Sequence, residues 1–452
     1  MFTHLNLENF KSWKSADVEF GRVTGLFGTN SSGKTSLIQF LLLLKQTKEA
    51  SDRNTALDLN GPYVALGTMA DAIFGHDKNL CLYYRIGMKL DDAIVVADTA
   101  GGRKSELTRS DKLTVAASIR LSGRTPEGDM LEYQLGSATF KLTRKPGKPH
   151  KYNLDTEGLK DFRFNRPKGR AWDLPGPIKS YRFPDQARTY YKNAGFLSDL
   201  EYAFEKHLDQ LYYLGPLRED PRRDYLWAHS KPTDVGKRGE KAIDAILAAQ
   251  ADGERRNLEP KARLKKFPEM VAHWLKEMGL IQEFRLDEIA EGSNRWQVKV
   301  KKQLNSPEVL LTDVGFGVSQ VLPVITLLYY VPKGSTVVLE QPEIHLHPLA
   351  QAELADLIIS VSCRRNVQII LESHSEHLLL RLQRRIAEGL IPSNDIRLYF
   401  CEASKGCSTI RELRLDLMGN IKNWPDQFMG DAFTETAEAE MARLLRAGKT
   451  AP

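Results

Sequence analysis

The chain has 452 residues, of which 42% are hydrophobic and 27% charged, with a formal net charge of +6 at pH 7. This composition is that of a globular, soluble protein with room for two or three domains. The four cysteines lack C-x-x-C spacing, so neither a disulfide framework nor a zinc site is predicted. No secretory signal opens the chain and no segment is long enough to span a bilayer, so we expect a cytoplasmic protein without a membrane partner.

The first elements form a recognisable series. Residues 2–7 and 16–20 alternate apolar and polar side chains, which predicts an antiparallel pair of strands. Residues 23–27 then read as a short buried strand, and residues 36–46 as an apolar helix.

A glycine-rich loop separates that strand from that helix. Residues 28–35, GTNSSGKT, match the phosphate-binding pattern G-x-x-x-x-G-K-[ST] at every constrained position. In such a loop the glycines let backbone N–H groups face phosphate oxygens, the lysine reaches the β- and γ-phosphates, and the threonine hydroxyl meets Mg²⁺. We therefore predict a nucleoside triphosphate site with Mg²⁺, formed by Gly28, Asn30, Ser31, Ser32, Gly33, Lys34, Thr35 and Ser36.

The middle of the chain divides into two insertions. Residues 48–185 contain strand-like runs separated by Gly and Pro, which predicts a β-rich insertion, and residues 186–280 have mostly helical spacing. Within the first, residues 141–170 combine many cations with interleaved aromatics. That pattern fits a strip that binds DNA or RNA, and it also fits a solvated loop; both interpretations stay open.

The last third returns to nucleotide chemistry. An apolar strand over residues 335–340 ends in Glu340 and is followed by Gln341. A carboxylate at the end of a buried strand beside a phosphate loop is placed to hold Mg²⁺. A second apolar strand, residues 367–371, leads to His374, which we expect to project as a γ-phosphate sensor.

A glycine-rich turn upstream of these strands opens an apolar helix. Its residues Gly317, Ser319 and Gln320 are predicted to bind phosphate at a helix N-terminus.

These motifs together resemble the ABC-type ATPase heads of the SMC, RecF and OLD branch. The likeness rests on N-F-K-S at residues 9–12, V-G-F-G-V-S-Q at 314–320, L-H-P at 346–348 and S-H-S at 373–375. Together with Y-L-G-P-L-R at 213–218, it is nearest to compact AAA-like bacterial ATPases. Several of these, such as the Septu and PARIS ATPases, serve in antiphage defence with a separate effector.

The resemblance implies an α/β P-loop NTPase fold, an ABC-type head interrupted by the β-rich and helical insertions. The expected division is residues 1–47 and 281–400 for the head, 48–185 and 186–280 for the insertions, and 401–452 for a C-terminal extension. It also implies that ATP is held between two heads, so that Ser319 of one copy meets the γ-phosphate bound by another. A homodimer or higher oligomer is therefore expected, with a partner effector such as a nuclease.

One departure from the family concerns catalysis. The resemblance places a metal-binding Asp and a catalytic Glu where this chain has Glu340 and Gln341. Because a glutamine amide cannot accept a proton from water, the general base lies elsewhere or hydrolysis is slow. Glu343 is the candidate base, so the predicted catalytic set is Glu340, Gln341, Glu343 and His374, with Thr35 and Glu340 on the metal.

Four further features keep structural and functional interpretations side by side. His345 and His347 favour a structural role over a metal pair because no third ligand is near. Trp13 is either an adenine-stacking ring or a packed aromatic. Arg218, Arg222 and Arg223 either approach a phosphate or a neighbouring molecule, or they form ion pairs at the surface. The tail over residues 431–446 predicts an amphipathic docking helix.

The sequence is compatible with three functions. The first is an ATP-hydrolysing regulatory subunit that controls an effector, in antiphage defence. The second is a DNA-binding repair ATPase of RecF type, and the third the nucleotide-binding subunit of a transporter, which the long β-rich insertion and the absence of L-S-G-G-Q disfavour. OLD relatives carry a Toprim nuclease after the ATPase, which is recognised by a Glu at the end of one strand and an Asp-x-Asp at the end of another. Glu402 follows a strand-like run, but no Asp-x-Asp follows it, so a nuclease within this chain is not expected.

Overall fold

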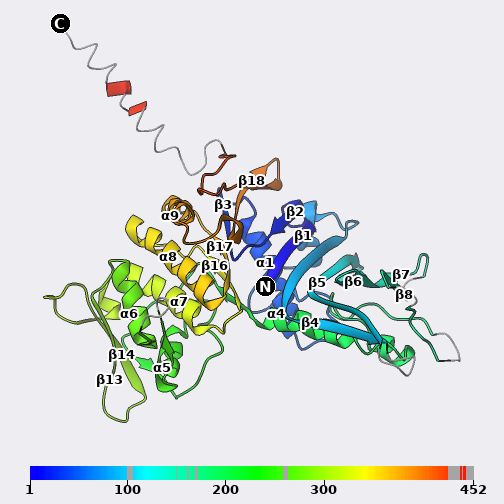
Figure 1. Cartoon of the computed structure of the whole chain (residues 1–452), viewed down its shortest axis with the longest axis horizontal. Coiled ribbons are helices and arrows are strands. Elements are labelled where there is room, and N and C mark those ends of the chain that lie inside the picture. Colours follow the sequence, from blue (N-terminus) through cyan, green and yellow to red (C-terminus); the bar gives the residue numbers. More distant parts are fainter. Residues whose placement is uncertain are drawn as a thin grey trace, which may run out of the picture.

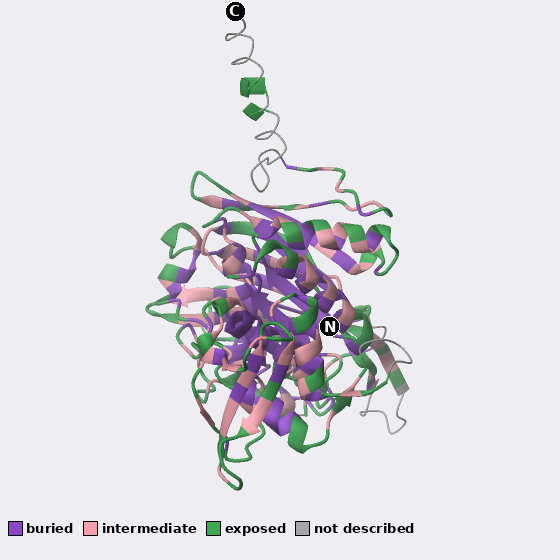
Figure 2. Ribbon diagram, turned by 90° about the vertical axis from the view of Figure 1, so that its left-hand side faces the viewer, coloured by how far each residue is buried: buried purple, intermediate pink, exposed green. Residues whose placement is uncertain are grey.

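The computed structural model describes residues 1–98, 105–148, 150–159, 162–167, 172–257, 263–425, 438–439 and 441–443. Figure 1 shows a central sheet between two lobes: an antiparallel lobe built on β4 to β8 and a smaller lobe that contains α5, α6, β13 and β14. Buried residues are concentrated in the middle of the molecule, where the central sheet lies (Figure 2). Almost all of the predicted tail helix lies outside the described residues.

The central sheet carries the phosphate-binding loop. Its strand order is β19 (Cys407–Glu412), β18 (Ile396–Ser404), β3 (Val23–Gly28), β17 (Gln368–Glu372), β16 (Thr336–Glu340) and β9 (Leu211–Leu214). All pairs are parallel except the one between β18 and β19. Both β16 and β17 are buried along their whole length, as expected for parallel strands covered on both faces.

Side chains of these strands alternate between two cores. Leu26, Val338 and Ile370 face one core, which contains α1 and the antiparallel lobe. Their neighbours Val337 and Ile369 face the other core, which contains α7 and α8. This alternation is the period-two geometry of a strand, and it places the sheet between two apolar layers.

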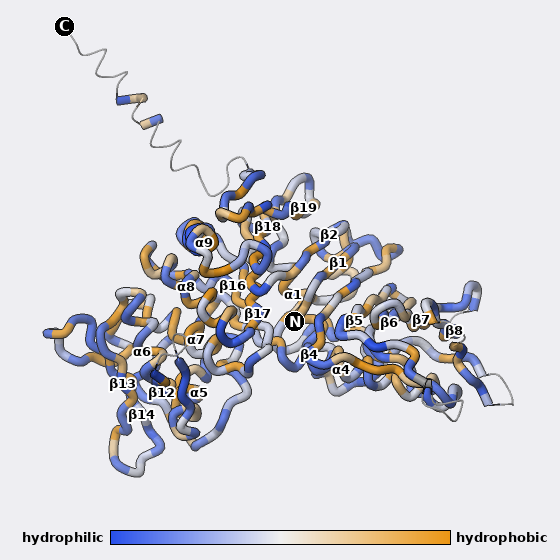
Figure 3. The backbone as a smooth tube through the Cα atoms, viewed as in Figure 1, coloured by the Kyte–Doolittle hydropathy of each residue, from blue (hydrophilic) through white to orange (hydrophobic). Residues whose placement is uncertain are grey.

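Helices cover both faces of the central sheet. They are α1 (Lys34–Glu49), α4 (Leu197–Asp209), α7 (Phe316–Tyr330), α8 (Pro348–Arg365) and α9 (Glu376–Ala387). Most of α7 is buried, which agrees with its continuous apolar sequence (Figure 3). None of the helices in the described ranges is long and apolar enough to cross a membrane.

The antiparallel lobe continues from the first two strands of the chain. Its order is β2 (Trp13–Glu19), β1 (Phe2–Phe10), β4 (Leu82–Asp98), β5 (Ser105–Ser122), β6 (Thr125–Leu135), β7 (Ala138–Arg144) and β8 (Tyr152–Glu157). Short helices α2 (Met69–Ala72) and α3 (Asp185–Tyr190) and the 3₁₀ turn Phe74–His76 lie in the connections. Strands β4 to β8, which lie within residues 48–185, form one sheet with β1 and β2, which lie before residue 48.

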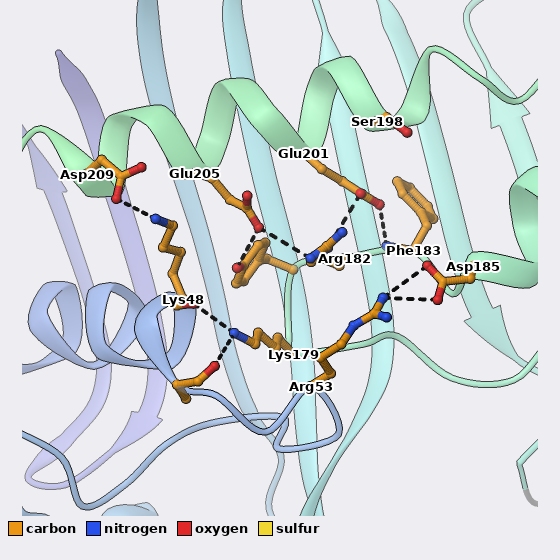
Figure 4. A network of polar contacts seen from close by, with 12 residues as sticks. Lys48, Arg53, Lys179, Arg182, Phe183, Asp185, Ser198, Glu201, Glu205 and Asp209 are labelled. Atoms are coloured by element: carbon orange, nitrogen blue, oxygen red, sulfur yellow. Dashed lines mark hydrogen bonds and ion pairs between the residues drawn. The ribbon is translucent and has the colours of Figure 1, made fainter.

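Polar contacts fasten this lobe to α1 and α4 (Figure 4). Lys179 Nζ donates hydrogen bonds to the carbonyl oxygens of Lys48 and Ala50, each at a distance of 2.7 Å. The side chain of Lys48 forms an ion pair with Asp209 at the end of α4. Two of these contacts use backbone carbonyls in the last turn of α1, where the helix leaves acceptors unpaired.

The smaller lobe packs on α7 and α8 through the second core. It contains α5 (Ala242–Ala251), α6 (Phe267–Glu277), β10 (Tyr225–Leu226), β11 (Arg255–Arg256), β12 (Lys265–Lys266), β13 (Glu283–Glu288), β14 (Arg295–Lys301) and β15 (Val309–Leu310). Further 3₁₀ turns occupy Leu311–Asp313 and Ser393–Asp395.

The expected boundaries differ from the structure at two places. β9 lies inside the predicted helical insertion yet pairs with β16 at the edge of the central sheet. β18 crosses the expected boundary at residue 400 and pairs with β3. The apolar run at residues 211–214 is strand-like in the sequence, but a four-residue run does not say which sheet it joins, and only the pairing reveals that.

The aromatics within residues 141–170 pack in the lobe, whereas Trp172, just beyond them, is 58% exposed. Phe162 is 5% exposed and packs with Phe164 and Phe196, at ring distances of 5.4 and 6.0 Å. Tyr152 is buried as well. These rings therefore cannot stack on nucleic-acid bases without unpacking the lobe.

Several cations of the same segment are neutralised within the lobe. Lys145 and Lys151 lie 2.6 and 2.8 Å from the carboxylate of Asp173. Lys141 lies 3.3 Å from Glu132. These contacts favour a folded surface over a strip that binds a phosphate backbone.

Candidate functional site

The phosphate-binding loop joins the end of β3 to the start of α1. Gly28 has φ 135° and Gly33, at the N-cap of α1, has φ 89°, both in the region that favours glycine. A Cβ at Gly28 would lie 2.1 Å from the carbonyl oxygen of Cys401 on β18. The adjacent strand therefore makes this glycine indispensable.

Trp13 packs against the phosphate-binding loop and holds it in place. Its side chain is fully buried, and its Nε1 donates to the carbonyl of Gly33 over 3.0 Å. The hydroxyls of Ser12 and Ser408, 2.7 Å apart, lie beside the same glycine. Burial of Trp13 rules out the adenine-stacking interpretation and assigns the indole to holding the loop.

Lys34 is folded back on its own loop. Its Nζ donates to the carbonyls of Gly28 and Thr29 over 3.1 and 2.7 Å and lies 3.9 Å from Glu372. Burial lowers the pKa of Lys34, and the charge of Glu372 opposes that shift. The ammonium is thus held at the loop, where a phosphate oxygen can replace the carbonyls as its partner.

Two carboxylates meet at the carboxyl edge of the sheet. Glu340 ends β16 and Glu372 ends β17, and the two residues are register partners of the parallel pair. They are 5% and 4% exposed. Glu372 Oε2 accepts a hydrogen bond from Thr35 Oγ1 over 2.8 Å, and Glu340 Oε1 accepts one from Tyr213 over 2.9 Å.

Burial controls the protonation of this pair. It raises the pKa of Glu340 to about 7, against the hydrogen bond from Tyr213, and the charge of Glu372 adds to the rise. Burial also raises the pKa of Glu372. A divalent cation between them would remove the repulsion and favour both ionised forms.

Gln341 and His374 complete the pocket. Gln341 has φ 43°, unusual for a residue with a side chain, and its N–H donates to the carbonyl of Glu372 over 2.8 Å. Burial, followed by the charge of Lys34, lowers the pKa of His374. The resulting pocket of about 270 Å³ is lined by Ser12, Asn30, Ser31, Ser32, Gly33, Lys34, Thr35, Ser36, Gln341, Glu372 and His374.

Glu343 lies beneath the segment that presents His374. Its Oε1 accepts hydrogen bonds from the Ser373 hydroxyl over 2.8 Å and from the His374 N–H over 2.7 Å. The carboxylate is buried and does not line the pocket. In this conformation Glu343 fixes the position of the histidine, which is a different task from the predicted proton abstraction.

Arg218 is buried behind the same edge. Its Nη2 donates to the carbonyl of Glu340 over 3.4 Å, and burial lowers its pKa to about 10. Two other nitrogens of its guanidinium, Nε and Nη1, find no hydrogen-bond partner among the described residues. The surface ion-pair interpretation is therefore wrong for Arg218, whereas Arg222 pairs with Glu219 and Arg223 with Asp313 at the surface.

The glycine-rich turn lies apart from this pocket. Gly317 and Gln320 do not line it, and Ser319 borders a separate small hollow with Arg222 and Pro323. The Ser319 hydroxyl donates to the carbonyl of Phe316 over 2.9 Å within the first turn of α7. The pocket of a single chain is thus lined by Ser12, residues 30–36, Gln341, Glu372 and His374. Glu340, Glu343, Gly317, Ser319 and Gln320 do not line it.

The oxygen atoms at the end of the pocket suit Mg²⁺, a cation that proteins often hold with only one or two side chains. Thr35 and Glu372 offer oxygens, as Mg²⁺ prefers, and Glu340 lies next to them. No group of three acidic, histidine or cysteine side chains that could hold a metal occurs among the residues described. His347 instead caps α8, its Nδ1 accepting from the Ala350 N–H over 3.3 Å, as the structural interpretation predicted.

Glu372, Tyr213 and Arg218 are the site residues that the motif search missed or left open. Glu372 could have been found by the rule applied to Glu340, because it also follows an apolar strand. Tyr213 and Arg218 carry no such signal. Their place is decided by the pairing of β9 with β16.

Comparisons with known proteins agree with this geometry. The sequence profile described as "AAA ATPase domain" matches residues 1–174 and 198–379. A second family, described as a protein of unknown function (DUF3696), matches residues 391–438. No curated protein matches the sequence.

Solved structures with a similar arrangement are SMC heads. The SMC head domain from Thermotoga maritima has 12% identity and a TM-score of 0.42, covering 91% of this chain and 99% of its own. An Smc head from Pyrococcus furiosus, bound to the C-terminal domain of ScpA, has 12% identity and a TM-score of 0.45, covering 92% and 96%. The match to the ATPase family confirms the expectation of an α/β ATPase fold.

Proposed function

The chain belongs to the family of AAA ATPase domains, and we propose that it binds and hydrolyses ATP in the pocket between the phosphate-binding loop and the ends of β16 and β17. The observation that carries this proposal is the convergence of three distant segments on one pocket. Lys34, Gln341, Glu372 and His374 line it together although up to 340 residues separate them. Lys34, Glu372 and His374 each have the chemistry that phosphoryl transfer needs at that place.

Each residue at the pocket has its own proposed role in binding ATP and Mg²⁺. The loop N–H groups and Lys34 bind the phosphates, and His374 faces the terminal phosphate. Thr35, Glu340 and Glu372 are the residues that would hold Mg²⁺, which supplies positive charge for the transferring phosphoryl group. Tyr213 orients the Glu340 carboxylate through its hydrogen bond.

The general base decides how fast ATP is hydrolysed. Gln341 lines the pocket at the position where the family resemblance places a glutamate, and its amide cannot take a proton. Glu372 does line the pocket, whereas the predicted base, Glu343, holds the histidine segment. We infer slow turnover, in which Glu372 is a second candidate base beside Glu343.

Comparison of two matched variants separates these roles. Glu372→Gln is expected to abolish turnover and weaken Mg²⁺-dependent ATP binding, because the residue contacts Thr35. Glu343→Gln is expected to retain ATP binding. If Glu343 is the base, turnover stops in that variant at every pH; if it positions His374, turnover falls only partly.

The ATPase proposal is tested with Lys34→Ala. We expect ATP turnover and ATP binding to be lost while the far-UV circular dichroism spectrum is unchanged. Lys78→Ala, which removes an exposed lysine of the antiparallel lobe, is the matched control and should retain activity. Wild-type turnover by Lys34→Ala would overturn the assignment of the loop.

We further propose that ATP drives self-association of the chain. The support is that Ser319 and its turn lie outside the pocket of their own chain, and that Phe316 at the start of α7 is 65% exposed. A second copy could bring its turn to the bound nucleotide. Light scattering should then show a larger species with a non-hydrolysable ATP analogue, and Ser319→Arg should prevent it; a monomer under all conditions would contradict the proposal.

A regulatory role follows from slow turnover and reversible association. We propose that the associated form controls a separate effector protein in the cytoplasm, in antiphage defence, which rests on the family resemblance described above. The test is protection of cells against phage by the gene with its genomic neighbours. Protection that is equal with Lys34→Ala would exclude ATP-dependent control.

A further inference from the structure

A second cavity lies at the edge of the central sheet opposite the ATP pocket. It has a volume of about 720 Å³ and is bounded by Tyr212 near the start of β9, by Pro332 and Lys333 before β16, and by the last turns of α7 and α8. Strand β16 separates this edge from Glu340 by five residues, or roughly 13 Å. The cavity is therefore distinct from the ATP pocket, with which it shares no lining residue.

The side chains around this cavity are strongly basic. Among the described residues, its lining includes the cations Lys231, Arg255, Arg256, Lys333, Arg364 and Arg365 and one acid, Glu254. Glu254 is paired with Arg256, and Lys231 with Asp252. Within the described part of the chain, the other four cations have no ion pair.

Arg365 shows that this excess charge extends into the protein interior. The residue is 6% exposed; its Nη2 donates to the carbonyl of Val331, and its guanidinium lies 5.9 Å from the ring of Tyr329. Its Nε has no hydrogen-bond partner among the described residues. Burial, followed by the charge of Arg256, lowers the pKa of Arg365 to about 10. A buried guanidinium without a carboxylate is costly unless an anion completes its environment.

Helix ends explain only part of this charge. Arg364 and Arg365 lie in the last turn of α8, where cations favourably meet the helix dipole. Lys231 and Arg255 come from other segments, and Lys333 follows α7. Three segments that are distant in sequence therefore bring further cations to the same cavity. Stabilisation of a helix end does not require these additional cations.

The cavity also contains aromatic walls. Tyr212, Tyr329 and Tyr330 line it beside the cations. The hydroxyl of Tyr330 donates to the carbonyl of Pro232 over 2.7 Å, which anchors the ring. Its volume lies within the ~300–1,000 Å³ of typical small-molecule sites.

We propose that this cavity is a second binding site, specific for a small phosphate-bearing ligand with a planar ring, that is, a nucleotide. Arg364, Arg365 and Lys333 bind the phosphates, because guanidinium groups match phosphate oxygens in charge and geometry. The half-buried ring of Tyr330 contacts the base, whereas Tyr212 and Tyr329 are 7% and 3% exposed and close the cavity wall behind it. This site is independent of the ATP pocket and of its turnover.

Binding of ADP to Lys34→Ala protein, measured by isothermal titration calorimetry, tests the proposal because the ATP pocket is then disabled. We expect one ADP per chain. Adding Lys333→Glu or Arg364→Glu, both exposed and thus compatible with folding, should weaken binding at least 10-fold. Lys78→Glu, the same charge reversal on an exposed lysine of the antiparallel lobe, should change it less than 2-fold.

Two further probes, inorganic pyrophosphate and a ten-nucleotide single strand of DNA, are titrated in the same way. They show whether the site binds a nucleotide, a free phosphate compound or a nucleic-acid backbone. Pyrophosphate binding that is weaker than ADP binding and sensitive to the same reversals supports the site. The proposal is overturned by the absence of ADP binding in Lys34→Ala, by equal binding in Lys333→Glu and Arg364→Glu, or by binding of the oligonucleotide alone.

Discussion

Replacement of Tyr213 by phenylalanine tests how one hydrogen bond sets the pKa of Glu340, a proposed Mg²⁺ ligand. The change keeps the ring and removes the hydroxyl that donates to Glu340 over 2.9 Å. Burial already raises the pKa of Glu340 from 4.5 to about 7, and this hydrogen bond opposes the rise. A hydrogen bond to a charged group is worth ~1.5–3 kcal/mol and one pKa unit corresponds to ~1.4 kcal/mol, so the pKa should rise further by about one to two units.

The sign of the effect on stability follows from proton binding. A carboxyl whose pKa is raised by folding holds its proton more tightly in the folded state. Its contribution to the free energy of unfolding is therefore fully present below pH 4.5 and is lost as the pH rises through about 7. For Glu340 this loss is on the order of 3 kcal/mol. In the variant the loss should continue to about pH 8 or 9, because the pKa is higher there.

Urea unfolding between pH 5 and 9.5, without nucleotide or metal, measures this difference directly. Mg²⁺-dependent ATP turnover gives a second readout, since its acidic limb should move upward by the same one to two units, roughly. Tyr212→Phe is the matched control, because Tyr212 neighbours Tyr213 on β9 but faces the other core. Superimposable pH curves for wild type and Tyr213→Phe, or a shift downward, would refute the reasoning.

Three further predictions concern the loop and the pocket. Gly28→Ala should lower the free energy of unfolding by about 2 kcal/mol or more, because the new Cβ meets the Cys401 carbonyl; an unchanged thermal midpoint would contradict this. Gln341→Glu should raise kcat about 10²-fold by supplying a base in the pocket, and unchanged kcat beside a Gln341→Asn control would show that no base is missing. Trp13→Phe should lower the free energy of unfolding by about 1 kcal/mol through loss of its bond to Gly33, measured by urea unfolding; equal stability would exclude that support.

Prediction from sequence succeeded where function demands a fixed local pattern. The spacing of Gly28, Gly33 and Lys34 predicts a strand, a loop and a helix, and all three are present. Glu340 was located by the apolar run before it, which is long enough to identify a buried strand. The resemblance to ATPase heads agrees with the AAA ATPase family match.

Other features could not be predicted because they depend on contacts between distant segments. Trp13 was compatible with stacking or packing until its indole was seen to donate to Gly33. The aromatics among the cations of residues 141–170 suggested base stacking, but Phe162 and Phe164 pack in the lobe. A pattern of residue types does not say which side of a loop faces the core.

The amino-acid sequence by itself determined the chemistry of the phosphate-binding loop and the periodic strands around it, because both arise from interactions among neighbouring residues. Only the tertiary structure placed Glu372 beside Thr35 and Tyr213 beside Glu340, since these pairs depend on the order of strands in the sheet. It likewise gathered Lys231, Lys333 and Arg365 around one cavity. Strand order is chosen by burial of apolar surface over the whole chain, and no local pattern encodes it.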